Sequence, residues 1–420
     1  MKLFKKIVSL TVAGAMTAAM LAGCGGAASS TASSAQTAAS TDSATSEAAS
    51  AEKHKIGVMF SSMGATQLQQ KEYLENYIGP KYNVDFMFSE ILKDNGAAIT
   101  FIEQARAAGC EGLMNFYSDS IEQATATANE AGIYMINNNN YIPESTQDMA
   151  YNIGSMGTSV ASTAEAYGEL VKPELADGQP HNVVIVSGGN AQGNRQHRET
   201  TAAIRQVLQD TYNLTYDKSI DDLSVSNVQT QVSTGTDMKI VIYPGYAGTD
   251  TYVTGFSSLL QSGEYDLVLS TYAVYPKLMQ PISEVEKAFD MDIHLVSIAA
   301  IDDSATSAFA EGALDSALLE PGSMIVGAMF TVLYNAIEGN AAAIEKDGKP
   351  SQYTMLKWTC KNADEYSKLS NLNTSADTYA ITTDDIDGLL VSKNADVNYD
   401  TVNGFFESLT AEGVLAKVGA

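Results

Sequence analysis

Cysteine is scarce in this chain: Cys24, Cys110 and Cys360 are the only three among 420 residues. Three cysteines are too few for a disulfide framework, and none has a partner nearby at the spacing of a metal site. A single bridge between Cys110 and Cys360 is one possibility, but two buried free thiols are the better prediction. The scarcity of cysteine therefore excludes a disulfide-stapled scaffold.

Basic residues are also few. The chain has 24 Lys and Arg against 50 Asp and Glu, a net charge of −26, and no basic cluster interrupts this excess. An acidic surface repels phosphate backbones, so we predict no nucleic-acid binding. Beyond the N-terminus, no stretch is long and apolar enough to cross a bilayer.

The motifs of several enzyme classes are missing as well. The glycine-rich run 188–193 has Asn190 where a dinucleotide loop needs its second glycine, and it lacks the ending of a nucleotide P-loop. No serine has the flanking glycines of a nucleophile elbow, and the four histidines are scattered. We therefore predict a protein that is not an enzyme and has no cofactor or metal. An extracellular hydrolase with paired carboxylates is the less favoured alternative.

The N-terminus is the one strongly apolar region. Three lysines within the first six residues precede an apolar run from Ile7 to Ala22, and Leu21-Ala22-Gly23-Cys24 follows. A basic start, a short apolar run and small residues are typical of a secretion signal, and the cysteine makes it resemble a bacterial lipoprotein signal. The resemblance implies that residues 1–23 are removed and that Cys24 is lipidated at the outer face of the cell membrane. An ordinary secreted protein with a coincidental cysteine is the alternative.

After Cys24, residues 25–51 are almost entirely Ala, Ser, Thr and Gly, with no periodic apolar face. Such a stretch buries too little surface to offset chain entropy, so we expect residues 24–53 to form a disordered tether. Flexible-chain scaling gives it a mean reach of roughly 30 Å.

From His54 onward, strand-like and helix-like segments alternate. The first set has expected strands at 55–60, 83–88, 112–116 and 133–136, with helices between them. A second set follows a helix at about 156–170, with strands at 182–187, 239–243, 266–270 and 293–298 and an added hairpin within 217–238. Strands at 315–320 and 354–360 flank a helix that Pro321 opens. This rhythm predicts an α/β fold with two Rossmann-like lobes, each with a parallel sheet.

The order and spacing of these pieces resemble the type I periplasmic binding proteins, specifically the ribose- and galactose-binding lipoproteins of ABC importers. The similar pieces are Lys55-Ile-Gly-Val, the run 111–120, Gly132-Ile133 with the asparagines at 137–140, Glu320-Pro321, and the run 361–366. The resemblance implies two lobes joined by a three-strand hinge, with crossings near 139–153, 299–303 and 356–360. Lobe 1 would hold 54–140 and 303–353, and lobe 2 would hold 141–302 and 354–420. Residues 371–420 extend past the usual end of the family, and a capped helix is expected after Thr383.

Ligands gather beyond the carboxyl ends of parallel strands, where backbone donors and helix N-termini converge. Amides, hydroxyls and rings at those positions suit a polyol, since amides pair with vicinal hydroxyls and a ring covers the C–H face. The candidate ligand-binding residues are Ser62, Tyr117, Asn137, Asn139, Asn190, Gln192, Arg195, Tyr246, Tyr272 and Glu320. Each also has a structural alternative: a polar turn for the asparagines, packing for the tyrosines, and a helix cap for Glu320.

Departures from the family pattern weaken a ribose or galactose assignment. An Asn-Pro-aromatic-aromatic run, an Asn-Asp pair and an Asp are replaced by residues 65–68, by Thr271-Tyr272-Ala273 and by residues near Ala299-Ala300. We therefore expect either a different sugar, bound by tyrosines and amides, or a ligand that is sugar-like but not a simple sugar. The resemblance implies a monomer that delivers it to an ABC permease, and the alternative is a sensor for a membrane kinase or chemoreceptor. The export signal and the absence of a DNA-binding helical pair before His54 exclude a repressor.

Overall fold

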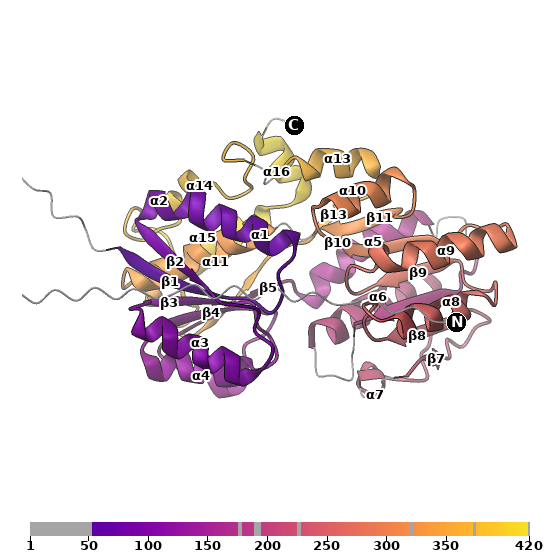
Figure 1. Cartoon of the computed structure of the whole chain (residues 1–420), viewed down its shortest axis with the longest axis horizontal. Coiled ribbons are helices and arrows are strands. Elements are labelled where there is room, and N and C mark those ends of the chain that lie inside the picture. Colours follow the sequence, from indigo (N-terminus) through magenta and orange to yellow (C-terminus); the bar gives the residue numbers. More distant parts are fainter. Residues whose placement is uncertain are drawn as a thin grey trace, which may run out of the picture. The chain divides into compact units, whose positions relative to one another are not determined.

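The computed structural model describes residues 53–174, 179–188, 195–224, 228–319, 322–372 and 375–418. They form a mixed α/β structure with two separate sheets dominated by parallel strands (Figure 1). The predicted fold class is confirmed. No helix within these residues combines the length and apolar character required to cross a membrane. The predicted signal segment, Cys24 and tether lie outside the described residues.

The first sheet has the strand order β12-β5-β4-β3-β1-β2, and all of its neighbouring pairs are parallel. Its strands are β1 (His54–Met59), β2 (Val84–Phe88), β3 (Gly112–Asn115), β4 (Tyr134–Asn138), β5 (Asn152–Gly157) and β12 (Ser351–Thr354). Its helical segments are α1 (Ala65–Glu72), η1 (Tyr73–Ile78), α2 (Gly79–Tyr82), α3 (Asn95–Ala107), α4 (Ile121–Ala131), η2 (Glu144–Thr146), α11 (Gly322–Ile337) and α12 (Ala341–Ile344).

Alternate residues of each strand point to opposite faces of this sheet, and different helices cover the two faces. Met59 and Leu113 point to the face covered by α3 and α4. Their neighbours Val58 and Met114 point to the opposite face, which α1, η1 and α11 cover. Because successive side chains alternate, a strand covered on both faces has apolar residues at consecutive positions, as Val58-Met59 in β1 and Leu113-Met114 in β3 do.

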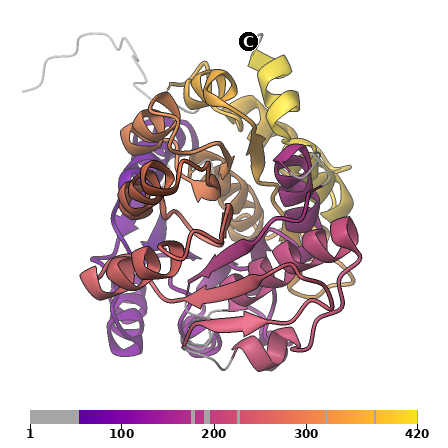
Figure 2. The same ribbon diagram turned by 90° about the vertical axis from the view of Figure 1, so that its right-hand side faces the viewer.

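The second sheet has the order β13-β11-β10-β9-β6-β8-β7, with antiparallel pairing only at its two edges. Its strands are β6 (Val183–Ser187), β7 (Thr230–Val232), β8 (Ile240–Pro244), β9 (Leu267–Ser270), β10 (His294–Ala299), β11 (Ser316–Leu319) and β13 (Trp358–Cys360). Its helices, which lie on both sides of the sheet (Figure 2), are α5 (Val160–Glu174), α6 (Arg195–Tyr212), α7 (Ile220–Ser224), α8 (Asp250–Leu260), α9 (Tyr275–Phe289), α10 (Asp303–Ala310) and α13 (Ala363–Ser370). A hairpin was expected within residues 217–238, but this region contains helix α7 and edge strand β7.

The lobe boundaries differ from those expected. The predicted helix at 156–170 overlooked β5, which belongs to the first sheet, so the first crossing lies between β5 and α5 rather than at 139–153. Strand β5 carries Asn152, Gly154 and Ser155, so it does not read as an apolar strand, although it is buried. Helix α10 and strand β11 belong to the second lobe, which moves the second crossing from 299–303 to the link between β11 and α11. The third crossing lies between β12 and β13, close to the expected position.

The C-terminal segment (residues 375–418) contains α14 (Thr383–Gly388), α15 (Tyr399–Ser408) and α16 (Ala411–Val418). It was expected on the second lobe, but α14 and α15 pack on the first, where buried Ile381, Leu390 and Phe406 extend the core. The helix predicted after Thr383 is confirmed, with Thr382 and Asp385 forming a capping box.

Candidate ligand-binding site at the strand tips

In the second lobe, three neighbouring parallel strands end side by side. The residues that follow them are held together by hydrogen bonds. The Gly245 N–H donates to the Ser187 carbonyl over 2.9 Å, and the Gly188 N–H donates to the Thr271 hydroxyl oxygen over 3.0 Å. The ends of β6, β8 and β9 therefore form one platform for the side chains that come next.

Three aromatic rings gather on this platform, and we call His197, Tyr246 and Tyr272 the tip cluster. The ring centroids are 5.9 Å apart for His197 and Tyr246, 5.7 Å for His197 and Tyr272, and 5.8 Å for the two tyrosines. Their interplanar angles are 61–69°, the edge-to-face geometry that aromatic pairs favour. Tyr246 is 43% exposed, so the cluster presents a ring to solvent.

Tyr272 is the fixed member of the cluster. Its hydroxyl donates to the Gly245 carbonyl and accepts from the Ala247 N–H, both over 2.9 Å. Burial raises the pKa of this phenol, which therefore stays neutral. A ring whose hydroxyl is already hydrogen-bonded has little conformational entropy left to lose. The free-energy cost of stacking a ligand on such a ring is therefore small.

His197 belongs to the tip cluster but was not among the residues predicted from the sequence. Its Nδ1 lies 3.0 Å from the Thr271 hydroxyl, and burial lowers the pKa of the imidazole to about 4, so it is neutral at pH 7. A Cβ on Gly188 would lie 2.6 Å from the His197 ring, so only glycine leaves room for it there. The one signal in the sequence was the position of His197 in the first turn of a helix after Gly188.

In the first lobe, the strand tips hold a buried chain of amides. The Asn115 Nδ2 donates to the Asn137 Oδ1 over 2.8 Å, and the Asn137 Nδ2 donates to the Thr125 hydroxyl over 3.2 Å. The Asn115 Oδ1 accepts from the Tyr117 N–H over 2.9 Å. Asn137 is 2% exposed and Tyr117 is 4% exposed. Of these two predicted ligand-binding residues, Asn137 bonds the tip of β4 to the tip of β3, and Tyr117 is held through its backbone to Asn115 at the end of β3.

Other candidates of the first lobe stay accessible. Ser62 is exposed after β1, and Asn139 is half-buried after β4. The Asn139 Oδ1 accepts from the Asn140 N–H over 2.9 Å, and Asn140 donates through its amide to the Glu199 carboxylate on α6. Glu199 is two residues beyond His197, so Asn140 of the first lobe bonds to α6 close to the member of the tip cluster that this helix carries.

The remaining candidates lie outside the described residues. They are Asn190, Gln192 and Glu320, together with the side chain of Arg195, whose backbone begins α6.

The third crossing places a lysine near the site. Burial lowers the pKa of Lys357 to about 7, and its charge helps to lower the pKa of His197. Cys110 and Cys360 are buried and free, as expected, and burial raises their pKa values to about 11 and about 12. Thiols of such high pKa are inert. Within the described ranges, no group of three or more His, Cys, Asp or Glu side chains could hold a metal ion.

Solved structures share this fold. A periplasmic sugar-binding protein from Pseudomonas fluorescens is 14% identical, with a TM-score of 0.58 over 86% of this chain and 99% of that one. An ABC transporter solute-binding protein from Bacillus halodurans C-125 with bound myo-inositol is 15% identical, with a TM-score of 0.56 over 76% and 97%. The transcription regulator CcpA of Lactococcus lactis is 10% identical, with a TM-score of 0.53 over 74% and 99%.

The chain therefore has the two-lobed fold of the type I periplasmic binding proteins, as the sequence resemblance implied. The sequence itself matches no protein-family model and no curated protein.

Proposed function

We propose that this protein is an extracytoplasmic solute-binding protein that captures a small polar ligand, a sugar or sugar-like molecule, between its lobes. The observation that carries the proposal is the tip cluster of His197, Tyr246 and Tyr272 beside the first-lobe asparagines. Rings that cover a C–H face and amides that pair with hydroxyls are the groups a polyol requires.

Two features of the site support a neutral ligand. His197 and Tyr272 are both uncharged at pH 7, because burial lowers the pKa of the first and raises that of the second. The nearby Asn139 amide carries no charge either. Two of the proteins that share the fold are sugar-binding or carry bound myo-inositol, and this favours the same ligand class.

In this proposal the ligand contacts Tyr246 and Tyr272 from one lobe and Ser62 and Asn139 from the other. A ligand that contacts both lobes binds the closed arrangement more tightly and shifts the population toward it. The closed form is then recognised by an ABC permease in the membrane. The lipid on Cys24 keeps the protein at the outer face of that membrane.

The test is isothermal titration of the purified protein with myo-inositol, common hexoses and pentoses, and nucleosides. We expect one of these probes to bind, and we expect Tyr272→Ala to weaken its binding by at least about tenfold, which is 1.4 kcal/mol. The matched control is Tyr212→Ala at the opposite end of α6, where the hydroxyl contacts the Gln179 carbonyl. Equal losses in the two variants, or binding that survives Tyr272→Ala, would contradict the site.

The membrane steps need separate tests. Cys24→Ser should release the protein from the membrane fraction, whereas Cys110→Ser should not, because Cys110 is a buried thiol. Delivery to a permease predicts ligand uptake that depends on this protein. A ligand response without uptake would instead favour the sensor.

A further inference from the structure

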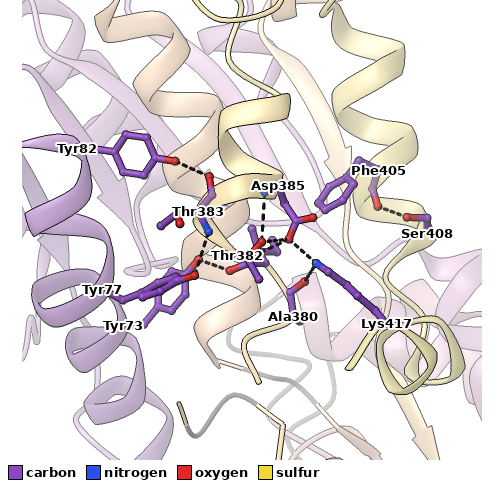
Figure 3. Close-up of polar contacts among 11 residues, drawn as sticks. Tyr73, Tyr77, Tyr82, Ala380, Thr382, Thr383, Asp385, Phe405, Ser408 and Lys417 are labelled. Atoms are coloured by element: carbon purple, nitrogen blue, oxygen red, sulfur yellow. Dashed lines mark hydrogen bonds and ion pairs between the residues drawn. The ribbon is translucent and has the colours of Figure 1, made fainter. Parts of the chain in front are cut away.

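Three tyrosines of the first lobe form hydrogen bonds with the C-terminal segment (residues 375–418) near its start (Figure 3). The Tyr73 hydroxyl donates to the Ile381 carbonyl over 2.8 Å, and the Tyr82 hydroxyl donates to the Thr383 carbonyl over 2.9 Å. The Tyr77 hydroxyl accepts from the Thr383 N–H over 3.1 Å. These bonds fix the start of α14 on η1 and α2.

Further hydrogen bonds attach the C-terminal segment to α11 and β12 of the first lobe. The Asn335 Nδ2 on α11 donates to the Leu389 carbonyl over 3.0 Å. Beside β12, the Tyr399 hydroxyl donates to the Gln352 carbonyl over 2.7 Å, and the Thr354 N–H donates to the Asn403 Oδ1 over 2.8 Å. Helices α14 and α15 are therefore part of the first lobe.

The last residues then reach the second lobe. The Trp358 Nε1, on edge strand β13 of the second sheet, donates to the Leu409 carbonyl over 2.8 Å, and Trp358 is 0% exposed. Helix α16 packs against α13, which also belongs to the second lobe. A cavity of about 290 Å³ separates residues 410–412 from α5, so the segment is not fully packed on that side.

Helix α16 is also tied back to the first lobe. Lys417 donates through Nζ to the Ala380 carbonyl over 3.1 Å and forms an ion pair with the Asp385 carboxylate (Figure 3). Ala380 and Asp385 flank the residues that the three tyrosines hold. The segment therefore contacts the second lobe at Trp358 and returns to its own anchor on the first.

We propose that the C-terminal segment is a strap that restrains rotation of the lobes about the crossings. Each crossing is a stretch of backbone that can absorb a rotation through its dihedral angles. The strap adds a link through a buried indole and a short helix, which must be strained or broken when the lobes move apart. The restraint rests on the lobe movement of the proposed function but requires no ligand.

The experiment measures inter-lobe distances without ligand, so its failure differs from a failure to bind sugars. In a Cys24→Ser chain, dyes on Glu103→Cys in α3 and Lys287→Cys in α9, both exposed positions, report the distance by single-molecule energy transfer. The test variant combines Trp358→Phe, which removes the donor to Leu409, with Lys417→Met. The matched control is Lys393→Met, which removes the Asp387 ion pair at the first-lobe end only.

We expect a broader and shifted distance distribution in the double variant and no change in the control. Hydrogen exchange should show faster exchange in α16 of the double variant, while β1 and β6 stay protected. A chain ending at Ser408 should broaden the distribution further. An unchanged distribution in the double variant would overturn the proposal, whether or not the shortened chain folds, and so would equal broadening in the control.

Discussion

The strand tips of the two lobes use polar residues in opposite ways. In the first lobe, Asn115, Asn137 and Thr125 bond to one another and are buried. In the second lobe, Thr271 and Gly245 anchor a half-exposed cluster of rings. The same position in a parallel sheet thus holds a buried amide network in one lobe and partly exposed rings in the other. The predictions below test that difference.

Acid should affect the second lobe most. The pKa of His197 is lowered from 6.5 to about 4 by burial, so between these values the unfolded chain binds a proton that the folded chain does not. The free energy of unfolding should therefore fall as the pH falls from 6.5 to 4, by about 3 kcal/mol from this group. Urea unfolding at pH 7.0, 5.5 and 4.5 measures it against His197→Gln. A difference between the two proteins that does not change with pH would refute the assignment.

Removal of the Asn137 amide in the first lobe should have the second-largest effect on the free energy of unfolding. Asn137→Ala leaves the Asn115 Nδ2 and the Thr125 hydroxyl without their partner in a buried site. We expect the free energy of unfolding to drop by about 2–3 kcal/mol, and ligand affinity to change little in the folded fraction. The control is Asn139→Ala, which should cost little stability but weaken binding. The reverse pattern would show that Asn137 is the ligand contact.

A methyl group at Gly188 should disturb the tip cluster without touching the first lobe. The added Cβ of Gly188→Ala would lie 2.6 Å from the His197 ring, which must move. We expect a loss of about 1–2 kcal/mol in stability, together with weaker ligand binding. Gly248→Ala is the control, because a Cβ there meets nothing within 4 Å. If Gly188→Ala behaves like Gly248→Ala, the ring is not confined as described.

The exposed tyrosine should give the smallest stability effect. Tyr246 is 43% exposed, so Tyr246→Ala should change the free energy of unfolding by no more than about 0.5 kcal/mol. Binding of the ligand identified by titration should nevertheless weaken several-fold, since a stacking ring is lost. Differential scanning fluorimetry and titration on the same sample separate the two. Unchanged affinity would remove Tyr246 from the site.

Much of the fold could be predicted from the sequence, but less of the site. Apolar runs such as 183–187 identify buried strands by themselves, because a strand covered on both faces must be apolar. Strand β5 was not predicted, because its polar residues Asn152 and Ser155, although buried, are typical of a loop. Asn137 and Tyr246 looked equally suitable as ligand contacts, since nothing in a sequence tells whether a polar group at a strand tip already has a partner. His197 was not predicted as part of the candidate site, because a single histidine without other functional residues at a regular spacing does not indicate a role.

The sequence by itself determined the local elements: the period of its apolar residues sets which segments become strands and helices, and their alternation sets parallel sheets. The tertiary structure alone decided which tip residues bond inward, where the chain crosses between the sheets, and that residues 375–418 lie on the first lobe and reach the second. Those outcomes depend on contacts between residues up to about three hundred positions apart, such as Tyr73 with Ile381. No local pattern encodes such pairs, because each partner is a common residue that becomes specific only when the fold brings the two together.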